Sequence, residues 1–160
     1  MALEPIISKV SIRGHPLHPA MIHFPIAALL FLIGADIAWV ITRDLFWARA
    51  ALWLAGVGTL MGWAAGIAGL IDLLAMQRVR RLITAWSHGI LAIMLLSLAT
   101  LNWLLRIVEP GAYILPWGLY LSVLSALLIA AAAYLGALLV YEHAVGVDIE
   151  EAEEHQEQLP

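Results

Sequence analysis

Four long apolar stretches divide the chain, and each is long enough to cross a lipid bilayer. They lie at about 20–42, 50–75, 85–106 and 115–141. A transmembrane helix needs about 20 mostly apolar residues, so each stretch predicts one span. The connections between the stretches are short, and short connections force neighbouring helices to run antiparallel. The pattern therefore predicts an all-α integral membrane protein, an up-down-up-down four-helix bundle with short loops.

Two segments lie outside the predicted transmembrane domain of residues 20–147. Residues 1–19 contain prolines that disfavour helix at the residues before them, so we expect an extended His-Pro segment there. Residues 148–160 are acidic and lack aromatic side chains, which predicts a solvated, disordered tail. The first residues show neither an early apolar core nor a small-residue cleavage site, so we expect no removable signal peptide.

Composition supports a membrane protein and excludes several kinds of site. The chain is 63% hydrophobic and 12% charged, whereas charged residues make up about a quarter of a soluble domain. It has no cysteine, so disulfides and cysteine-ligated zinc or iron–sulfur centres are excluded. Six of the twelve acidic residues lie in the last thirteen positions, and the remainder carries eight basic and six acidic residues. That balance does not support nucleic-acid binding.

Four spans place both ends of the chain on one side of the membrane. Five basic residues belong to that side, against three on the other: Lys9, Arg13, Arg78, Arg80 and Arg81 against Arg43, Arg49 and Arg106. Basic residues favour the cytoplasmic side of membrane proteins. We therefore expect a multi-pass membrane protein with both termini in the cytoplasm.

Most of the histidines converge on the side that holds the termini. Five of the six histidines and one aspartate lie close to this side, in or beside the ends of the spans: His15, His18, His23, Asp72, His88 and His143. Ionisable groups inside spans are costly and are usually functional, which favours a ligand or proton site. The alternative is that each group is solvated among lipid headgroups. His155 lies in the acidic tail and is expected to be solvated.

Small residues share helical faces with these polar side chains. His23 shares its face with Ala27 and Gly34, and His88 with Ala92 and Ala99. Asp72 and His143 likewise follow small residues: Gly58, Gly62 and Gly69 for Asp72; Ser125, Ala132 and Gly136 for His143. Small residues line helix–helix contacts in membranes, so we expect all four polar groups to point into the bundle. The glycines of the second span predict close helix packing, or else room for a flat cofactor.

Prolines shape the approach to the first span. In a polyproline II turn, which repeats every three residues, His15 and His18 would project from one side. Pro19 can open the helix, because its missing N–H is not needed there, and a kink at Pro25 would re-aim His23. The alternative interpretation is a stiff start to the span with no binding role.

A smaller polar group lies near the opposite membrane face. It comprises Asp36 in the first span and Asn102 and Arg106 in the third. We interpret it as a structural ion pair or hydrogen-bonded clasp rather than as a binding site.

Several of these segments resemble one family of proteins. They are GHPLHPAMIHFPIA (14–27), GLID (69–72), the histidine at position 88 and LGALLVYEHAVGV (135–147). Together they resemble a bacterial family of predicted four-span membrane proteins of unknown function. This resemblance implies a location in a bacterial inner membrane. Some relatives are joined to Rieske iron–sulfur or other redox modules, which implies a respiratory context. Relatives often have glycine where this chain has Ala144, and asparagine where it has Ala92.

The residues and the resemblance together favour b-type haem and a role in electron transfer. Neutral imidazoles on facing helices can supply two axial ligands, and His23 with His88 is the expected pair. His15, His18 and His143 would support a second haem or hydrogen-bond the first. Arg13 and Arg81, with Arg78 and Arg80, would meet the haem propionates at the interface.

Three other functions stay open. The first is a non-haem metal site for zinc, iron or another transition metal, with the five histidines and Asp72 as candidate ligands. The second is a proton-linked transporter, which would require a homo-oligomer because four helices make a thin conduit. The third is a structural subunit of a membrane complex. Expected partners are the lipid bilayer and, for the haem hypothesis, a redox protein; a catalytic residue set is not apparent.

Overall fold

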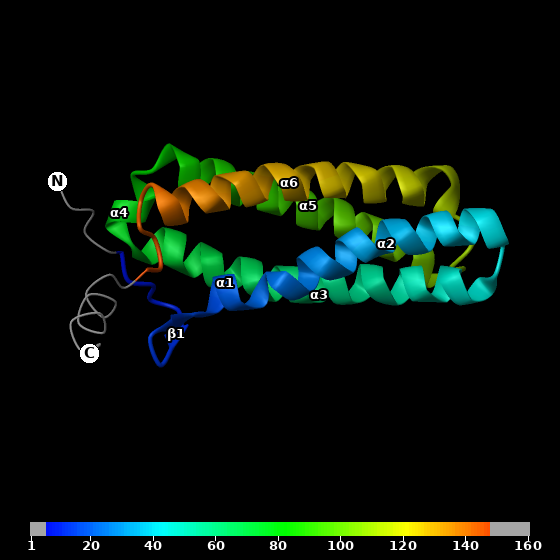
Figure 1. Cartoon of the computed structure of the whole chain (residues 1–160), viewed down its shortest axis with the longest axis horizontal. Helices are drawn as coiled ribbons and strands as arrows, with labels where there is room; N and C mark the ends of the chain where they lie inside the picture. The colour runs from blue at the N-terminus through cyan, green and yellow to red at the C-terminus, as the bar shows by residue number, and fades with distance from the viewer. Residues whose placement is uncertain (1–5, 148–160) are drawn as a thin grey trace, which may run out of the picture.

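Residues 6–147 are described by a computed structural model, and four of its helical segments are long and apolar enough to cross a membrane. These spans are Leu17–Thr42, Leu45–Ala75, Ile83–Ile107 and Ile114–Tyr141. They pack against one another as an all-α bundle (Figure 1), which confirms the predicted fold class. The predicted acidic tail at 148–160, with His155, lies outside the described residues.

The first span consists of two helices, α1 (Leu17–Met21) and α2 (His23–Thr42), joined at Ile22. Pro25 explains the break, because its nitrogen carries no hydrogen for the carbonyl of Met21, four residues earlier. Because His18 belongs to α1, it is helical. The predicted polyproline II turn that would align it with His15 is wrong. Pro19 permits this because it lies in the first turn of α1, where a missing N–H is tolerated.

The second span, α3 (Leu45–Ala75), is longer than expected. Its first turn is capped by Asp44, whose carboxylate accepts a hydrogen bond of 2.8 Å from the backbone N–H of Phe46. The cap explains why the helix begins five residues before the predicted start at position 50. Its 31 residues correspond to a length of about 46 Å. A short helix, α4 (Gln77–Arg80), follows it.

The third and fourth spans form the second layer of the bundle (Figure 1). Helix α5 comprises Ile83–Ile107. The fourth span begins with one turn of π-helix, η1 (Ile114–Gly118), and continues as α6 (Leu119–Tyr141). In Figure 1, α5 and α6 lie together above α1, α2 and α3.

The segment before α1 is not simply extended. Strands β1 (Ser11–Ile12) and β2 (His15–Pro16) pair antiparallel, with Ser11 opposite Pro16 and Ile12 opposite His15. Arg13 and Gly14 form the two-residue turn, with φ of 51° and 79°. Two-residue hairpin turns favour positive φ at both positions, which suits Gly14. Upstream, Ile6 forms a parallel bridge with Val145, beyond the end of α6.

An apolar cluster fills the middle of the bundle. Its buried members come from all four spans: Leu29, Leu32, Ala35, Ala51, Ala55, Ala99 and Ile129. The glycines of α3 permit this packing, because a Cβ at Gly58 would lie 2.7 Å from the Cγ of Leu29, and one at Gly62 would collide with Leu96. These glycines therefore serve close helix packing in the middle of the bundle.

Candidate functional site

His18 of α1 and His88 of α5 come together near the end of the bundle that holds the hairpin. Their ring centroids are 6.0 Å apart and their planes are nearly perpendicular, at 88°. Both side chains are half-buried. The structure pairs His88 with His18 and not with the expected His23, because His23 lies five residues beyond His18, about 140° around a helix, and is exposed.

Backbone carbonyls fix the hydrogen position on both rings. The Nδ1 atom of His18 lies 2.8 Å from the carbonyl oxygen of Ala65 on α3, and that of His88 lies 2.9 Å from the carbonyl oxygen of Ala132 on α6. A carbonyl oxygen only accepts hydrogen bonds, so each Nδ1 carries the hydrogen. In the neutral form of either ring, the lone pair then lies on Nε2. Metal-binding histidines are commonly held by this arrangement.

Two glycines provide space beside the imidazoles. A Cβ at Gly69 of α3 would lie 2.9 Å from the Nδ1 of His18, too close for a side chain. A Cβ at Gly136 of α6 would lie 3.4 Å from the Cε1 of His88. Gly69, the last glycine of α3, therefore leaves room for the ring of His18, whereas Gly58 and Gly62 allow close helix packing.

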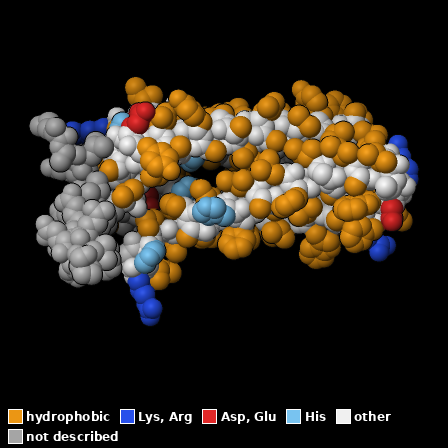
Figure 2. All heavy atoms as spheres, in the orientation of Figure 1, with side chains coloured by type: hydrophobic (Ala, Val, Ile, Leu, Met, Phe, Trp, Pro, Cys, Tyr) orange, Lys and Arg blue, Asp and Glu red, His pale blue; other side chains and the backbone are white. Residues whose placement is uncertain are grey.

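The surface is hollowed between the two helix layers at the hairpin end of the bundle. Figure 2 shows this hollow, with histidine side chains at its margin and hydrophobic side chains around it. A ligand there would reach both the bundle interior and the surrounding lipid.

Three of the predicted histidines lie elsewhere. His23 is exposed on α2, and Ala27 and Gly34 on the same face are exposed too. The inference that this face points into the bundle is therefore wrong, because the buried face of α2 carries larger residues such as Leu29 and Leu32. His15 is exposed in β2 and bonds the carbonyl oxygen of Arg13 at 2.9 Å. His143 is half-buried just after α6.

Asp72 is engaged by the N-terminal segment. Its Oδ1 accepts hydrogen bonds from the backbone N–H groups of Lys9, at 2.8 Å, and Val10, at 3.0 Å. Its Oδ2 accepts a hydrogen bond from the hydroxyl of Ser8. Both carboxylate oxygens thus have donors in the segment before α1, and Asp72 itself is half-buried.

The structure does not assemble a larger ligand set. Arg13 is exposed in the hairpin turn, and Arg81 is exposed after α4. Within residues 6–147, no three His, Asp or Glu side chains are grouped closely enough to hold a metal ion. The arrangement therefore offers two imidazole ligands, from His18 and His88.

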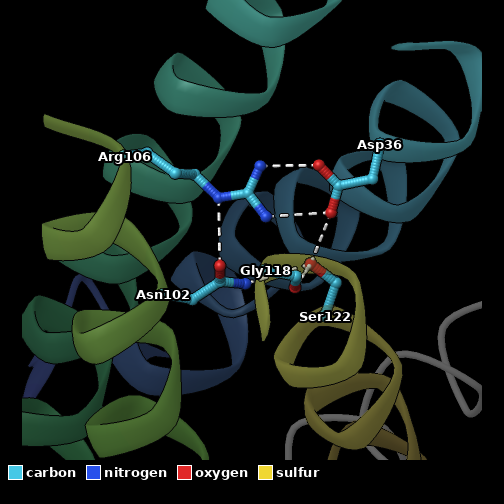
Figure 3. A network of polar contacts seen from close by, with 5 residues as sticks. All are labelled: Asp36, Asn102, Arg106, Gly118 and Ser122. Atoms are coloured by element: carbon cyan, nitrogen blue, oxygen red, sulfur yellow. Dashed lines mark hydrogen bonds and ion pairs between the residues drawn. The ribbon is translucent and has the colours of Figure 1, made fainter. Parts of the chain in front are cut away.

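A second polar cluster lies near the opposite end of the bundle (Figure 3). The guanidinium of Arg106 binds both oxygens of Asp36, at 2.6 and 2.9 Å, and its Nε donates to the Oδ1 of Asn102 at 3.0 Å. Ser122 of α6 accepts a hydrogen bond from Asn102 and lies 2.8 Å from Asp36. All four side chains are buried. The predicted structural ion pair is confirmed.

Sequence reasoning missed Ser122 and Gly118 in this cluster. A Cβ at Gly118 would lie 2.7 Å from the Nη2 of Arg106, so glycine is needed beside the guanidinium. The available signal was the spacing of four residues, which puts Gly118 and Ser122 on one face of the fourth span. The carbonyls of Ala65 and Ala132 carry no signal in the sequence, because every residue has one.

The spacing of His18 and His88 restricts what they can hold. Two imidazoles that share one metal from opposite sides, each with a metal–nitrogen bond of about 2 Å, place their ring centres about 6 Å apart. An aromatic diol that donates to both nitrogens would need a separation nearer about 13 Å, given hydrogen bonds of about 2.7 Å. The 6.0 Å spacing is therefore compatible with an ion between the rings and too short for a quinol that donates to both.

Comparison with known proteins places the chain in a family. Residues 14–149 match the family described as "Predicted membrane protein (DUF2231)". No curated protein and no solved structure matches the chain. Because the match covers most of the sequence, the chain belongs to this family.

Proposed function

We propose that this member of the DUF2231 family binds b-type haem between His18 and His88 and transfers electrons within the membrane. The observation that carries the proposal is the pair of imidazoles 6.0 Å apart, each with its Nδ1 hydrogen bonded to a helix carbonyl. That hydrogen bond leaves Nε2 available as an axial ligand.

The number of ligands favours haem over a bare ion. A porphyrin supplies four nitrogen ligands itself, so two histidines complete the coordination of its iron. A protein site for zinc uses three or four protein ligands, and three candidate ligands do not gather anywhere in residues 6–147. The hollow with histidine side chains at its margin (Figure 2) and the basic residues at the same end, including Arg80 and Arg81, are consistent with a bound haem.

A single transition-metal ion is the second candidate. The 6.0 Å spacing of the rings suits an ion shared by two imidazoles, and water or another small molecule would supply its further ligands.

Proton-linked transport is less favoured, because the apolar cluster that includes Leu29, Leu32 and Ile129 separates the two polar clusters. A purely structural role is also less favoured, because helix packing alone does not require two imidazoles 6.0 Å apart that each donate from Nδ1 to a helix carbonyl.

We also propose that the hairpin end of the bundle faces the cytoplasm of a bacterial cell. Arg106 does not count toward the opposite side, because it is buried in an ion pair. The basic residues that remain are five at the hairpin end and two, Arg43 and Arg49, at the other. This charge difference favours a cytoplasmic hairpin end.

An absorbance spectrum tests the haem proposal directly. The protein, expressed with ample haem and purified in detergent, is expected to show a Soret band and reduced α and β bands typical of two histidine ligands. His18→Ala and His88→Ala are each expected to abolish the low-spin spectrum. The matched controls His15→Ala and His23→Ala alter exposed histidines and should leave it unchanged.

Two results would reject haem. One is a wild-type protein without a Soret band, and the other is a spectrum that survives both His18→Ala and His88→Ala. Elemental analysis of the same washed samples separates the second candidate. A stoichiometric metal without haem, lost in both variants, would support the single-ion site.

A further inference from the structure

Asp72 is linked to His18 through a short series of contacts. We call residues 6–16, which precede α1 and include the hairpin, the N-terminal strap. Asp72 accepts hydrogen bonds from the backbone N–H groups of Lys9 and Val10 in the strap. The carbonyl oxygen of Val10 in turn accepts a hydrogen bond of 2.9 Å from the N–H of Leu17, the residue just before His18. Two hydrogen bonds that share Val10 therefore connect Asp72 to the residue just before His18.

One face of α3 holds both ends of this series. Ala65, Gly69 and Asp72 follow one another at spacings of four and three residues, so they share a helical face. The carbonyl of Ala65 accepts the hydrogen of His18, and Gly69 leaves room for its ring. Asp72 secures the strap one turn further along. The same helix face therefore orients the imidazole and secures the chain that carries it.

The strap has few other polar attachments. At its start, the N–H of Ile6 donates to the carbonyl of Ala144 at 3.0 Å, and its carbonyl accepts from Gly146 at 2.8 Å. Ile6 packs in an apolar cluster with Leu73 and Met76. From Ile7 to Pro16 most residues are exposed or half-buried, and Ser8 is the buried exception, bonded to Asp72. Hydrogen bonds to a charged carboxylate are stronger than neutral ones, so Asp72 is the main polar anchor of this part.

We infer that Asp72 is a positioning residue that holds the N-terminal strap against α3 and thereby fixes His18 opposite His88. This role differs from that of a metal ligand, which Asp72 was expected to be from the sequence. The inference deepens the proposed function, since His18 is one of the two proposed haem ligands. Its structural part, the attachment of the strap, does not require haem.

The first arm of the test measures the strap without any cofactor. The chain has no cysteine, so Ile12→Cys in the hairpin and Ile83→Cys at the start of α5, both exposed, can carry spin labels in the apo protein. The distance distribution between the labels is expected to be narrow. Asp72→Ala should broaden it, because the three strap donors lose their acceptor. An unchanged distribution in Asp72→Ala would overturn the inference.

Two comparison variants make this result specific. Asp44→Ala removes the carboxylate that caps the other end of α3, so it should leave the distribution narrow even if it lowers stability. Asp72→Asn keeps one oxygen that can accept from Lys9 and Val10, and should restore most of the narrow distribution. Broadening of equal size in Asp44→Ala would show that any weakening of α3 loosens the strap, which contradicts a specific role of Asp72.

The second arm measures ligand geometry in haem titrations. Loss of an orienting partner of a metal ligand commonly weakens metal affinity 10- to 100-fold. Asp72→Ala is expected to bind haem about 10-fold more weakly and to show a high-spin component from loss of the His18 ligand. Asp72→Asn should restore the low-spin spectrum. If wild-type protein binds no haem, the proposed function fails while the spin-label arm still decides the role of Asp72; a low-spin spectrum and affinity retained by Asp72→Ala would reject its effect on His18.

Discussion

Ala144 adopts a backbone conformation that alanine disfavours. Its φ is 51°, in the left-handed region, and it is buried just beyond α6, where its carbonyl accepts a hydrogen bond from Ile6. The left-handed conformation costs an L-residue about 1–2 kcal/mol relative to glycine. Glycine, which has no Cβ, would adopt this conformation without that strain.

Ala144→Gly is therefore expected to stabilise the protein. Relief of the backbone strain exceeds the extra entropy that glycine brings to the unfolded chain, and the net gain is up to about 1 kcal/mol. Thermal unfolding in detergent measures it. Ala130→Gly, at an exposed position in the regular part of α6, should instead lower the melting temperature. A lower melting temperature in Ala144→Gly would contradict the strained conformation.

Gly69→Ala is expected to weaken the proposed haem site. A new Cβ would lie 2.9 Å from the Nδ1 of His18 and displace the ring from the carbonyl of Ala65. Overpacking of this kind costs about 1–3 kcal/mol, which corresponds to a loss of affinity of about 5- to 150-fold in a haem titration. Gly34→Ala, with no atom within 4 Å of its Cβ, is the matched control. Equal affinity in the two variants would contradict the role of Gly69.

At the residue scale the sequence predicts which side of the membrane holds the histidines, but not which of them meet. Depth along the chain favoured His23, whereas the structure pairs His18 with His88. His18 and His23 are five residues apart, about 140° around a helix, so His23 points away from His88 when His18 faces it. A single sequence shows this spacing, but it does not specify which of the two histidines faces the bundle.

At the scale of elements, the buried ion pair joins three spans at one level. Asp36 comes from α2, Asn102 and Arg106 from α5, and Ser122 from α6 (Figure 3). The two charges neutralise each other, and the remaining contacts satisfy hydrogen-bonding groups that lipid could not. The cluster therefore fixes the relative positions of these helices. The sequence predicted its charged members correctly, since two opposite charges at the same depth of different spans have few other partners.

Arg106→Met is expected to destabilise the bundle strongly. Removal of one partner leaves the carboxylate of Asp36 buried without its counter-charge, which costs about 3–5 kcal/mol. The double variant Asp36→Asn, Arg106→Met removes both charges and should recover most of this loss. Unfolding temperatures of the single and double variants in detergent measure the difference. A double variant as unstable as Arg106→Met would show that shape rather than charge accounts for the effect.

At the scale of the whole molecule, hydrophobic length was sufficient to predict the number and order of the spans. The ends of the spans were less accurate, because local features set them: the cap at Asp44 extended α3, and the turn at Arg13 and Gly14 converted a predicted extended segment into a hairpin. Such features act through individual hydrogen bonds and backbone angles. Hydropathy, which averages over many residues, does not register them.

Surface labelling of single cysteines tests the orientation of the molecule. Val108→Cys lies in the loop after α5, and Ile12→Cys lies in the hairpin; both side chains are exposed. With a cytoplasmic hairpin end, a membrane-impermeant maleimide should label Val108→Cys in intact cells with a permeable outer membrane. It should label Ile12→Cys only after the inner membrane is opened. The reverse result would place the hairpin end outside.

The length of α3 makes bilayer thickness relevant to the candidate site. At about 46 Å, its 31 residues exceed a hydrocarbon core of about 30 Å. Such a helix must tilt or protrude into the headgroup layer, and Gly69 and Asp72 lie in its last two turns. Thicker membranes would draw these turns into hydrocarbon, where water no longer competes for the strap's hydrogen bonds. Hydrophobic mismatch therefore connects lipid composition to how firmly His18 is held.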